Sequence, residues 1–311
     1  MAQSGVVIIG GGIMGGDIAT IFAAGSWHVH VMSPSAKTRD ALPARLAAGL
    51  QNLGADAANA ALVKTYAGLD AIPWPDVGLV VEAATEDLAL KQKLFSRLEA
   101  LARPDIPLAS NTSTFQIGAI GNHLKTRARV VGLHYFMPAH LVPLVEVIQA
   151  DFTDKAIADW LEQNQKELGK APVRVNKDIP GFIGNRLQHA MMREALYLIA
   201  DGAVSPEGID TAVRFGFGFR FIACGPMLQK EMSGWDTNLY AGTSLYPSLH
   251  NDQAPPQFLK DMVAKGHIGM KAKRGLWQWT DDSVAKEKMR IEKALQAAFE
   301  ILKADTAVSK Q

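Results

Sequence analysis

Residues 6–9 form a short, continuous apolar run that stops at a cluster of glycines, Gly10-x-Gly12-x-x-Gly15. An apolar run of this length predicts a strand that is buried on both faces, as in a parallel sheet. Small and apolar residues then recur at helical spacing over residues 13–24, and Gly25 is suited to end that helix in the left-handed conformation. A second apolar run follows at residues 29–32. Strand, helix and strand within about 30 residues make one βαβ unit, so the chain must begin as an open α/β fold.

The same pattern continues toward residue 178. Apolar runs at residues 77–81, 106–109, 130–133 and 142–148 predict further strands, and helical spacing covers residues 88–101 and 154–168. Alternating strands and helices predict a parallel or mixed sheet of at least about six strands. We expect a Rossmann-type α/β domain over residues 1–178.

Strand-like runs nearly vanish beyond the turn cluster at residues 178–181. Helical spacing runs from Ile183 to a stop at Gly202, then from an N-terminal Ser205-Pro206 to Gly216, and finally over residues 283–302. The pair Met191-Met192 is expected to have a core or packing role. These features predict an all-helical C-terminal domain over residues 179–311.

Composition excludes several classes of protein. The chain has 311 residues and a net charge of +1, which is too small for a nucleic-acid-binding surface. A single cysteine excludes an intrachain disulfide and fits a reducing compartment. No apolar run reaches the roughly 18 residues of a membrane-spanning helix. We expect a cytoplasmic protein with a small-molecule substrate, and the spacing of histidines and carboxylates predicts no metal site.

The glycine cluster lies between a predicted strand and a predicted helix, where such a motif binds the pyrophosphate of a dinucleotide. Gly10 allows the tight turn, Gly12 lets backbone amides approach the phosphates, and Gly15 allows close packing of helix and strand. The candidate cofactor-binding residues here are Gly10, Gly12, Ile13, Met14 and Gly15. The alternative is a glycine turn with only a structural role.

The end of the second strand bears on the choice of coenzyme. A carboxylate at this position commonly binds the ribose 2′-hydroxyl of NAD, but the residue here is Ser33. Serine leaves room for a 2′-phosphate, which Ser35, Lys37 or Arg39 could bind. NAD and NADP both remain open, with a slight preference for NADP. The alternative is that Lys37 and Arg39 are solvated residues of the next helix.

Four further motifs follow in order, and together with the glycine cluster they resemble the 3-hydroxyacyl-CoA dehydrogenase family over nearly the whole chain. They are the segments 110–113 (SNTS), 132–138 (GLHYFMP), 143–147 (PLVEV) and 180–186 (PGFIGNR). The resemblance implies a nicotinamide-dependent dehydrogenase with a Rossmann-like domain and a helical domain.

The residue types in these motifs suit that chemistry. Oxidation of an alcohol needs a group that accepts its proton, and histidine, with an unperturbed pKa of about 6.5, suits this task near neutrality. His134 is the candidate base, and Glu146 would orient its imidazole. Ser113 and Asn185 can hold the reacting oxygen, with Asn185 contributed by the second domain. The resemblance implies the same four catalytic roles.

Glu86 and Lys91 match family positions beside the nicotinamide, so they are candidate cofactor-binding residues. From the sequence alone they could equally be an exposed pair at the start of a helix.

The chain departs from the CoA-dependent pattern. Residues 41–70 contain only Arg45 and Lys64 as basic residues, which leaves little to bind the phosphates of CoA. The region around residues 137–146 and the segment 216–226 look more like the branch that acts on free hydroxy acids, such as L-gulonate 3-dehydrogenase and L-carnitine dehydrogenase. Arg220 could bind a substrate carboxylate, or could instead be a surface residue capping a helix, and His140 could line the substrate site.

The sequence therefore predicts an NAD(P)-dependent oxidoreductase that interconverts a 3-hydroxy acid and a 3-oxo acid, and it favours a homodimer. One alternative is a short-chain 3-hydroxyacyl-CoA dehydrogenase. Another is a catalytically silent, dinucleotide-binding structural protein of the kind found among lens crystallins.

Overall fold

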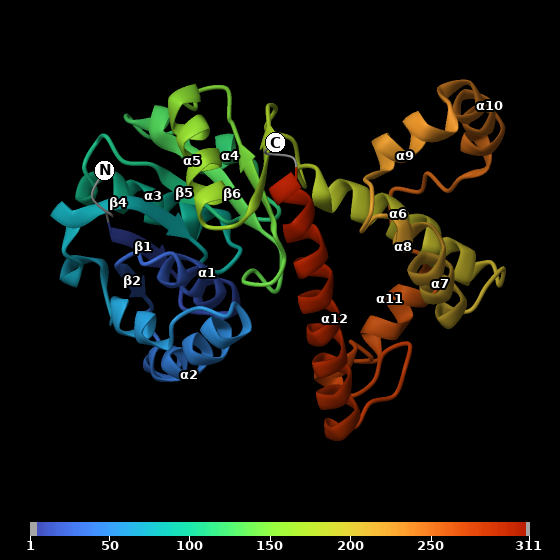
Figure 1. Ribbon diagram of the computed structural model, residues 1–311, viewed down its shortest axis with the longest axis horizontal. Coiled ribbons are helices and arrows are strands. Elements are labelled where there is room, and N and C mark those ends of the chain that lie inside the picture. The colour runs from blue at the N-terminus through green and yellow to red at the C-terminus, as the bar shows by residue number, and fades with distance from the viewer. Residues whose placement is uncertain (1–4, 309–311) are drawn as a thin grey trace. The chain divides into compact units, whose positions relative to one another are not determined.

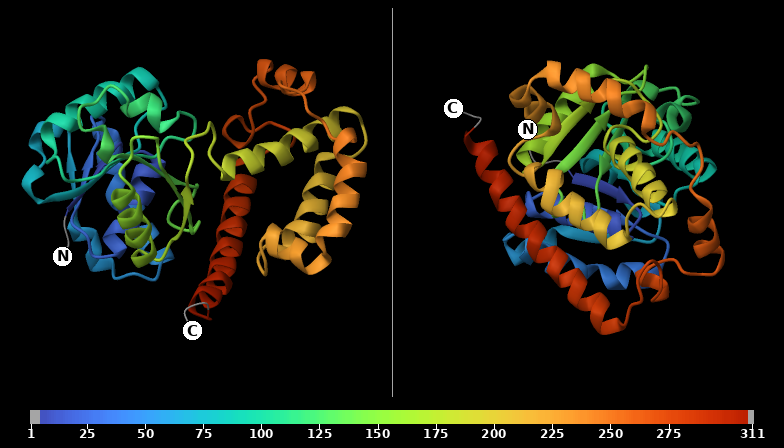
Figure 2. Two further views of the ribbon diagram at one scale, coloured as in Figure 1. Left: turned by 90° about the horizontal axis from the view of Figure 1, so that it is seen from above. Right: turned by 90° about the vertical axis from the view of Figure 1, so that its right-hand side faces the viewer.

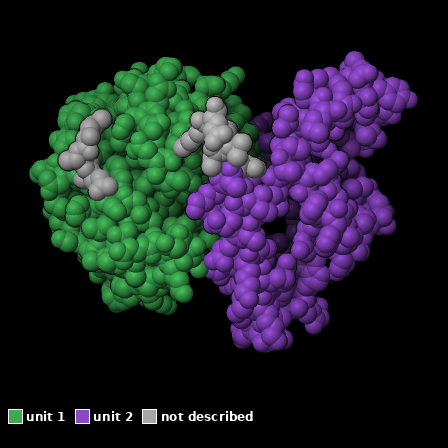
Figure 3. Space-filling model, in the orientation of Figure 1, with its two compact units in different colours: residues 1–185 green, residues 186–311 purple. Residues whose placement is uncertain are grey.

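The computed structural model describes residues 5–308, and the side chains of residues 5–304. The chain divides into two compact units, residues 1–185 and 186–311, which are coloured separately in Figure 3. The first unit therefore includes residues 179–185, which the sequence analysis assigned to the helical domain. Each unit is described by itself below.

Unit 1 is built on an eight-stranded sheet with the order β3-β2-β1-β4-β5-β6-β7-β8 (Figure 1). Strands β6 and β7 are antiparallel, whereas the other neighbouring strands are parallel. The strands are β1 (Gly5–Ile9), β2 (Val29–Met32), β3 (Val63–Tyr66), β4 (Val77–Glu82), β5 (Leu108–Ser110), β6 (Val130–Tyr135), β7 (Leu144–Ile148) and β8 (Ala171–Val175). The predicted mixed sheet and Rossmann-like fold class are confirmed.

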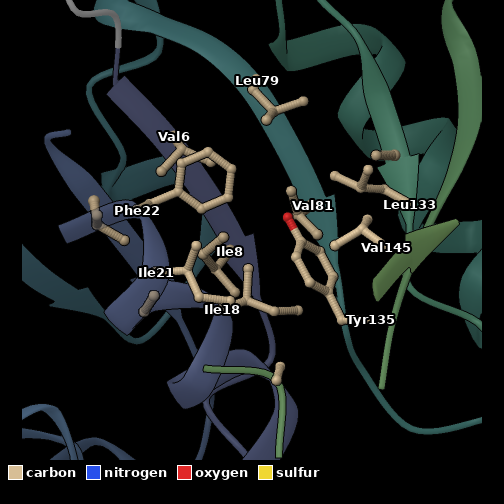
Figure 4. Packing of buried hydrophobic residues seen from close by; sticks show 14 of the residues in the cluster. Val6, Ile8, Ile18, Ile21, Phe22, Leu79, Val81, Leu133, Tyr135 and Val145 are labelled. Atoms are coloured by element: carbon tan, nitrogen blue, oxygen red, sulfur yellow. The ribbon is translucent and has the colours of Figure 1, made fainter. Parts of the chain in front are cut away.

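Helices cover both faces of the sheet, as the left-hand view of Figure 2 shows. Helices α1 (Ile13–Ala24), α2 (Ala36–Asn52) and α5 (Lys155–Glu167) pack on one face, and α3 (Leu88–Leu101) and α4 (Ile117–Gly121) pack on the other. Successive residues of β1 point to opposite faces, so Val6 and Ile8 belong to one core and Val7 and Ile9 to the other. Figure 4 shows Phe22 packing beside Val6 in the first of these cores.

The strand order reverses direction between β1 and β4, because β2 and β3 extend to one side and β5 and β6 to the other. Ligands of open α/β sheets bind at such a switch point, outside the carboxyl ends of the strands. The residues that end β1, β4, β5 and β6 are therefore the ones that position a site.

The turn after α1 differs from the prediction. Gly25 has φ −80° and is not left-handed; Ser26 instead has φ 63°. A Cβ on Gly25 would lie 2.3 Å from Cδ2 of Leu168. Any larger residue here would require the Leu168 side chain at the end of α5 to move, and the left-handed turn comes one residue later.

Unit 2 is helical, and no strand occurs within its residues 186–308. The helices are α6 (Gly184–Ala200, which begins in unit 1), α7 (Pro206–Ala212), α8 (Gly218–Arg220), α9 (Pro226–Ser233), α10 (Trp235–Leu245), α11 (Gln257–Ala264) and α12 (Asp281–Val308), with a π-helical turn at Val213–Phe217. Gly202 has φ 71° and ends α6, and the Ser205 side chain caps α7, as predicted.

Unit 2 has almost no apolar core. Among its described side chains, the buried hydrophobic residues are Ala195 and Val284. Met191 and Met192, predicted to have a core or packing role, are 40% and 41% exposed, so they do not lie in a core of this unit. Their apolar helix faces are left uncovered by the rest of the unit.

Across the described residues, no helix combines the length and the apolar character that crossing a lipid bilayer requires.

Candidate active site

The glycine loop between β1 and α1 has the shape of a phosphate cradle. Gly10 has φ 105°, and a Cβ there would lie 2.5 Å from the carbonyl oxygen of Ala83. A Cβ on Gly15 would lie 1.7 Å from the Gly10 carbonyl oxygen, so only glycine fits. Nothing lies within 4 Å of the corresponding position on Gly12, and no side chain caps the start of α1. The open amino end of α1 therefore fits the pyrophosphate of a dinucleotide.

Arg45 of α2 braces this loop, a contact that the sequence analysis missed. Its Nη1 donates to the carbonyl oxygens of Gly12 at 2.7 Å and Gly11 at 3.3 Å. One of the two basic residues between positions 41 and 70 is thus turned toward the glycine loop.

Ser33 and Arg39 come together at the end of β2. Ser33 is buried, and Nη1 of Arg39 donates to its carbonyl oxygen at 2.6 Å and to that of Pro34 at 3.0 Å. Ser35 caps α2, because its hydroxyl accepts from the amide of Thr38. Lys37 is exposed. The guanidinium of Arg39 is therefore fixed at the strand end, whereas the ammonium of Lys37 is not.

His134 and Glu146 face each other on the antiparallel strands β6 and β7, where they are register partners. Nδ1 of His134 lies 2.7 Å from Oε2 of Glu146, and both side chains are buried. The other oxygen, Oε1, accepts from the amides of Ile183 at 2.8 Å and Gly184 at 2.9 Å, at the start of α6. Burial raises the pKa of the Glu146 carboxyl, but the hydrogen bonds from His134 and from these amides outweigh it and hold the pKa below its usual value.

The opposite nitrogen of His134 faces Ser113. Nε2 of His134 lies 3.2 Å from Oγ of Ser113, and Nδ2 of Asn185 donates to the Ser113 carbonyl oxygen at 3.4 Å. The rings of Phe136 and Phe182 flank the imidazole, with centroids 4.6 Å and 5.6 Å away. The structure thus brings the four predicted catalytic residues together, and all four belong to unit 1.

Glu86 and Lys91 meet in a charged cluster with a residue that the sequence analysis did not single out, Glu82. Lys91 is 1% exposed, and its Nζ lies 2.8 Å and 3.0 Å from the two carboxylate oxygens of Glu82 and 3.1 Å from Oε2 of Glu86. The alternative of an exposed pair at a helix start is therefore wrong for Lys91, which is buried, whereas the Glu86 side chain is 38% exposed. Oε1 of Glu86 also accepts from the amides of Ser113 and Thr114, which fixes the loop that carries the Ser113 hydroxyl.

His140 lies away from the dyad, in the loop between β6 and β7. Its Nδ1 is 3.3 Å from Oδ2 of Asp17, and its Nε2 is 3.4 Å from the Asn52 amide nitrogen. Both ring nitrogens therefore face α1 and α2, which favours a role in holding the loop over the predicted role in substrate binding.

Arg220 lies in unit 2, where it is exposed. The side-chain amide of Gln229 faces its guanidinium, at distances of 2.7–3.1 Å with the amide oxygen toward it. Both residues line a cavity of about 540 Å³ whose other walls are Phe219, Ile222, Ala223, Cys224, Met232, Ser233 and Ile301. This apolar cavity with one guanidinium suits an organic anion.

Four buried or half-buried charged residues were missed: Asp17, Arg45, Glu82 and Lys170. Asp17, Arg45 and Glu82 each follow or interrupt an apolar stretch, and charge within such a stretch is a signal that could have found them; Lys170 follows a polar helix end and carries no such signal. Among the described residues, no group of three or more histidine, cysteine or acidic side chains could hold a metal ion.

Comparisons with known proteins identify the family. Residues 5–179 match the family model of the NAD-binding domain of 3-hydroxyacyl-CoA dehydrogenases. The model for the C-terminal domain of the same dehydrogenases matches residues 181–279.

The curated relatives act on differing substrates. The chain is 31% identical over 304 residues to 5-formyl-3-hydroxy-2-methylpyridine 4-carboxylate 5-dehydrogenase of Mesorhizobium japonicum, covering 94% of this chain and 93% of that one. It is 29% identical over 316 residues to L-carnitine dehydrogenase of Nocardiopsis dassonvillei, covering 97% and 94%. A crystal structure of a 5-formyl-3-hydroxy-2-methylpyridine 4-carboxylic acid 5-dehydrogenase, described as an NAD⁺-dependent dismutase, superposes with a TM-score of 0.89 at 27% identity, covering 97% of this chain and 99% of that chain.

Proposed function

The chain belongs to the 3-hydroxyacyl-CoA dehydrogenase family and is a nicotinamide-dependent dehydrogenase of CH–OH groups, and we propose that its substrate is a free 3-hydroxy acid. The reaction interconverts this hydroxy acid and the 3-oxo acid. The observation that carries the proposal is the buried pair of His134 and Glu146, with Ser113 against the free side of the imidazole.

His134 is the general base and acid of this mechanism. The ionised Glu146 accepts the hydrogen of Nδ1, which leaves the lone pair of Nε2 directed toward Ser113. Nε2 takes the hydroxyl proton when the alcohol is oxidised and returns it when the carbonyl is reduced. The positive imidazolium is stabilised by the Glu146 carboxylate, since the two groups are 2.7 Å apart in a buried site. A bound nicotinamide coenzyme supplies the hydride acceptor.

Ser113 and Asn185 position the reacting oxygen. The Ser113 hydroxyl can donate to the developing carbonyl oxygen, and Asn185 holds the Ser113 backbone in place. Phe136 and Phe182 keep water away from the imidazole, which strengthens each of these interactions.

The chain has an NAD-binding domain, and within that class we propose a preference for NADP. A 2′-phosphate would meet the fixed guanidinium of Arg39 and the amide or hydroxyl groups around Ser33. No carboxylate stands at the end of β2 to repel that phosphate.

Two observations favour a free acid over a CoA thioester. Arg45, one of only two basic residues between positions 41 and 70, is committed to the glycine loop. The two relatives described above act on small substrates that carry a carboxylate, carnitine and a pyridine carboxylate. Arg220 is the residue we assign to that carboxylate, on the strength of its apolar cavity.

We also propose that the enzyme is a homodimer formed through unit 2. A unit of this size normally buries a core of its own, yet large apolar side chains of unit 2 such as Phe219, Met232 and Tyr240 are 68–80% exposed. A second copy offers the same apolar helix faces, so a symmetric dimer would cover both sets.

The proposed activity is tested by the oxidation of NADPH and NADH with a panel of free 3-oxo acids and with acetoacetyl-CoA. We expect turnover of free acids only, and a loss of about 100- to 10,000-fold in kcat for His134→Ala with unchanged coenzyme binding. Faster turnover of acetoacetyl-CoA would identify a short-chain 3-hydroxyacyl-CoA dehydrogenase instead. Coenzyme binding without turnover of any substrate would identify a silent, structural protein.

A further inference from the structure

We propose that buried Glu82 and Lys91 and the partly exposed Glu86 form a charge centre with one net negative charge, which favours binding of the oxidised coenzyme over the reduced one. This inference rests on the proposed function, because it concerns the nicotinamide end of the coenzyme site. It assigns to Glu82, at the end of β4, a role in setting the charge of the site without contact with the reacting atoms.

The hydrogen-bond partners of Glu82 are those of a carboxylate. It is completely buried, and its Oε1 accepts from the amide of Ala84 at 2.7 Å and from Lys91 at 2.8 Å. Oε2 accepts from the hydroxyl of Ser110 at 2.7 Å and from Lys91 at 3.0 Å. Three groups make four donor contacts to the two oxygens, and a protonated carboxyl would have to turn a hydrogen toward one of these donors.

Glu86 is also ionised. Burial raises the pKa of its carboxyl, but the hydroxyl of Thr112 and the charge of Lys91 outweigh it, so the pKa stays below the usual value. Lys91 is the cation that both carboxylates share, at 2.8 Å from Glu82 and 3.1 Å from Glu86. Two carboxylates and one ammonium leave a single negative charge.

The topology puts this charge at the nicotinamide end of the coenzyme. The adenosine half belongs to the β2 side of the switch point, where Ser33 and Arg39 lie. A dinucleotide crosses the switch point, so its nicotinamide half belongs to the carboxyl ends of β4, β5 and β6. Those ends carry Glu82, Ser110 and His134.

The physical consequence follows from the charge of the ring. The oxidised nicotinamide ring carries a positive charge and the reduced ring carries none, so a fixed negative charge stabilises only the oxidised form. Glu82 and Lys91 are buried, so their interaction with the ring is weakly screened by water and salt, whereas Glu86 is 38% exposed and is screened more. The net charge of the cluster should therefore set the ratio of the two dissociation constants.

Glu82→Gln changes that charge with little change in shape. The amide oxygen can still accept from Ala84 and Lys91, and the amide nitrogen can donate to Ser110. The net charge of the cluster rises from −1 to 0. We expect the ratio of the oxidised to the reduced dissociation constant, measured by calorimetry or coenzyme fluorescence without substrate, to rise about fivefold or more.

The double variant Glu82→Gln/Lys91→Met separates charge from structure. It removes one carboxylate and the ammonium, so Glu86 again leaves a net charge of −1. We expect the ratio to return to the wild-type value, although more contacts have been lost than in the single variant. Glu99→Gln is the matched control, because it removes a carboxylate from the far end of α3, about 12 Å along the helix from Lys91.

A ratio that is unchanged in Glu82→Gln, or one that does not return in the folded double variant, would overturn the inference. If Glu82→Gln fails to fold, as judged by circular dichroism, Glu86→Gln decides, because it also raises the net charge from −1 to 0 and must raise the ratio. Failure of the wild type to bind either form of either coenzyme would instead contradict the proposed function.

Discussion

Arg39 is a single residue whose position sets a choice between two coenzymes. Both of its hydrogen bonds to β2 backbone oxygens come from Nη1. Within the described part of the chain, Nη2 makes no further hydrogen bond, so that edge can bind a phosphate. This geometry converts the sequence prediction about residues 33–39 into a prediction about one guanidinium.

Arg39→Ala should lower kcat/KM for NADPH about 10- to 100-fold, because a hydrogen-bonded charge pair contributes about 1.5–3 kcal/mol. The value for NADH should change less than about threefold, since NADH carries no 2′-phosphate. Steady-state kinetics with both coenzymes measures the two ratios. Arg97→Ala is the control, because Arg97 is an exposed residue of α3 that pairs with the exposed Asp70. Equal losses with both coenzymes would show that Arg39 only supports the fold.

Individual residues differed in how well the sequence predicted them. Ser113, His134 and Glu146 were found because each lies in a local motif after or within a strand. Their proximity depends on the tertiary fold, but it is expected, because the ends of neighbouring strands meet at one edge of the sheet. Glu82 was missed because a charged residue at the end of an apolar run looks like the boundary of a buried strand, while its partner Lys91 comes from the next helix.

At the scale of elements, the loop between β6 and β7 is held by two buried charged groups. Oδ2 of Asp17 accepts from the amide of Ala139, and Nζ of Lys170 donates to the carbonyl oxygens of Ala139, His140 and Val142. This loop joins the strand of His134 to the strand of Glu146, so its anchors help to keep the dyad in register.

The stability of the fold should depend on pH through Lys170. Burial lowers its pKa to about 8, although Asp17 opposes this, whereas the unfolded chain has the usual value near 10.5. Between these values the unfolded state binds more protons, so the free energy of unfolding rises with pH. Relative to Lys170→Met, the wild type should gain about 2 kcal/mol between pH 7.5 and pH 9.5.

Urea unfolding of both proteins at the two pH values measures this gain. The exposed Lys155 provides the control, because Lys155→Met should show the same pH dependence as the wild type. A difference between wild type and Lys170→Met that stays constant with pH would contradict the assignment.

The sequence predicted the strands correctly where both faces of a strand are buried. Strands β1, β2, β4 and β6 coincide with the predicted apolar runs because both of their faces are covered. The edge strands β3 and β8 were missed. Lys64 and Thr65 interrupt β3, and Pro172 and Arg174 interrupt β8, which an edge position tolerates because one side of the strand needs no partner.

At the scale of the whole molecule, the proposed dimer makes stability depend on protein concentration. The free energy of unfolding should rise by about 1.4 kcal/mol for each tenfold increase in concentration, because dissociation and unfolding of unit 2 are coupled. Sedimentation should give a mass of twice 33.6 kDa. Leu239→Glu, on α10, should weaken the dimer, since this leucine is 74% exposed in the single chain.

Val173→Glu is the control for that substitution, because Val173 is a partly exposed apolar residue of β8 in unit 1. A monomer whose unfolding midpoint is independent of concentration would contradict the dimer.

The sequence could predict that unit 2 is helical, but not that its helices lack a core, because helical spacing reveals an apolar face without revealing what covers it.

The carboxylate of Glu146 divides its oxygens between His134 and the amides of residues 183 and 184. For protein engineering, this means that the segment connecting the two units cannot be exchanged freely, because its backbone amides bind Glu146. A chimaera that joins the first unit to the helices of a relative should keep residues 182–185 of the recipient and be fused after Asn185. A fusion point a few residues earlier would import foreign backbone into the proton-transfer machinery, and the helical part would no longer be a neutral module for changing specificity.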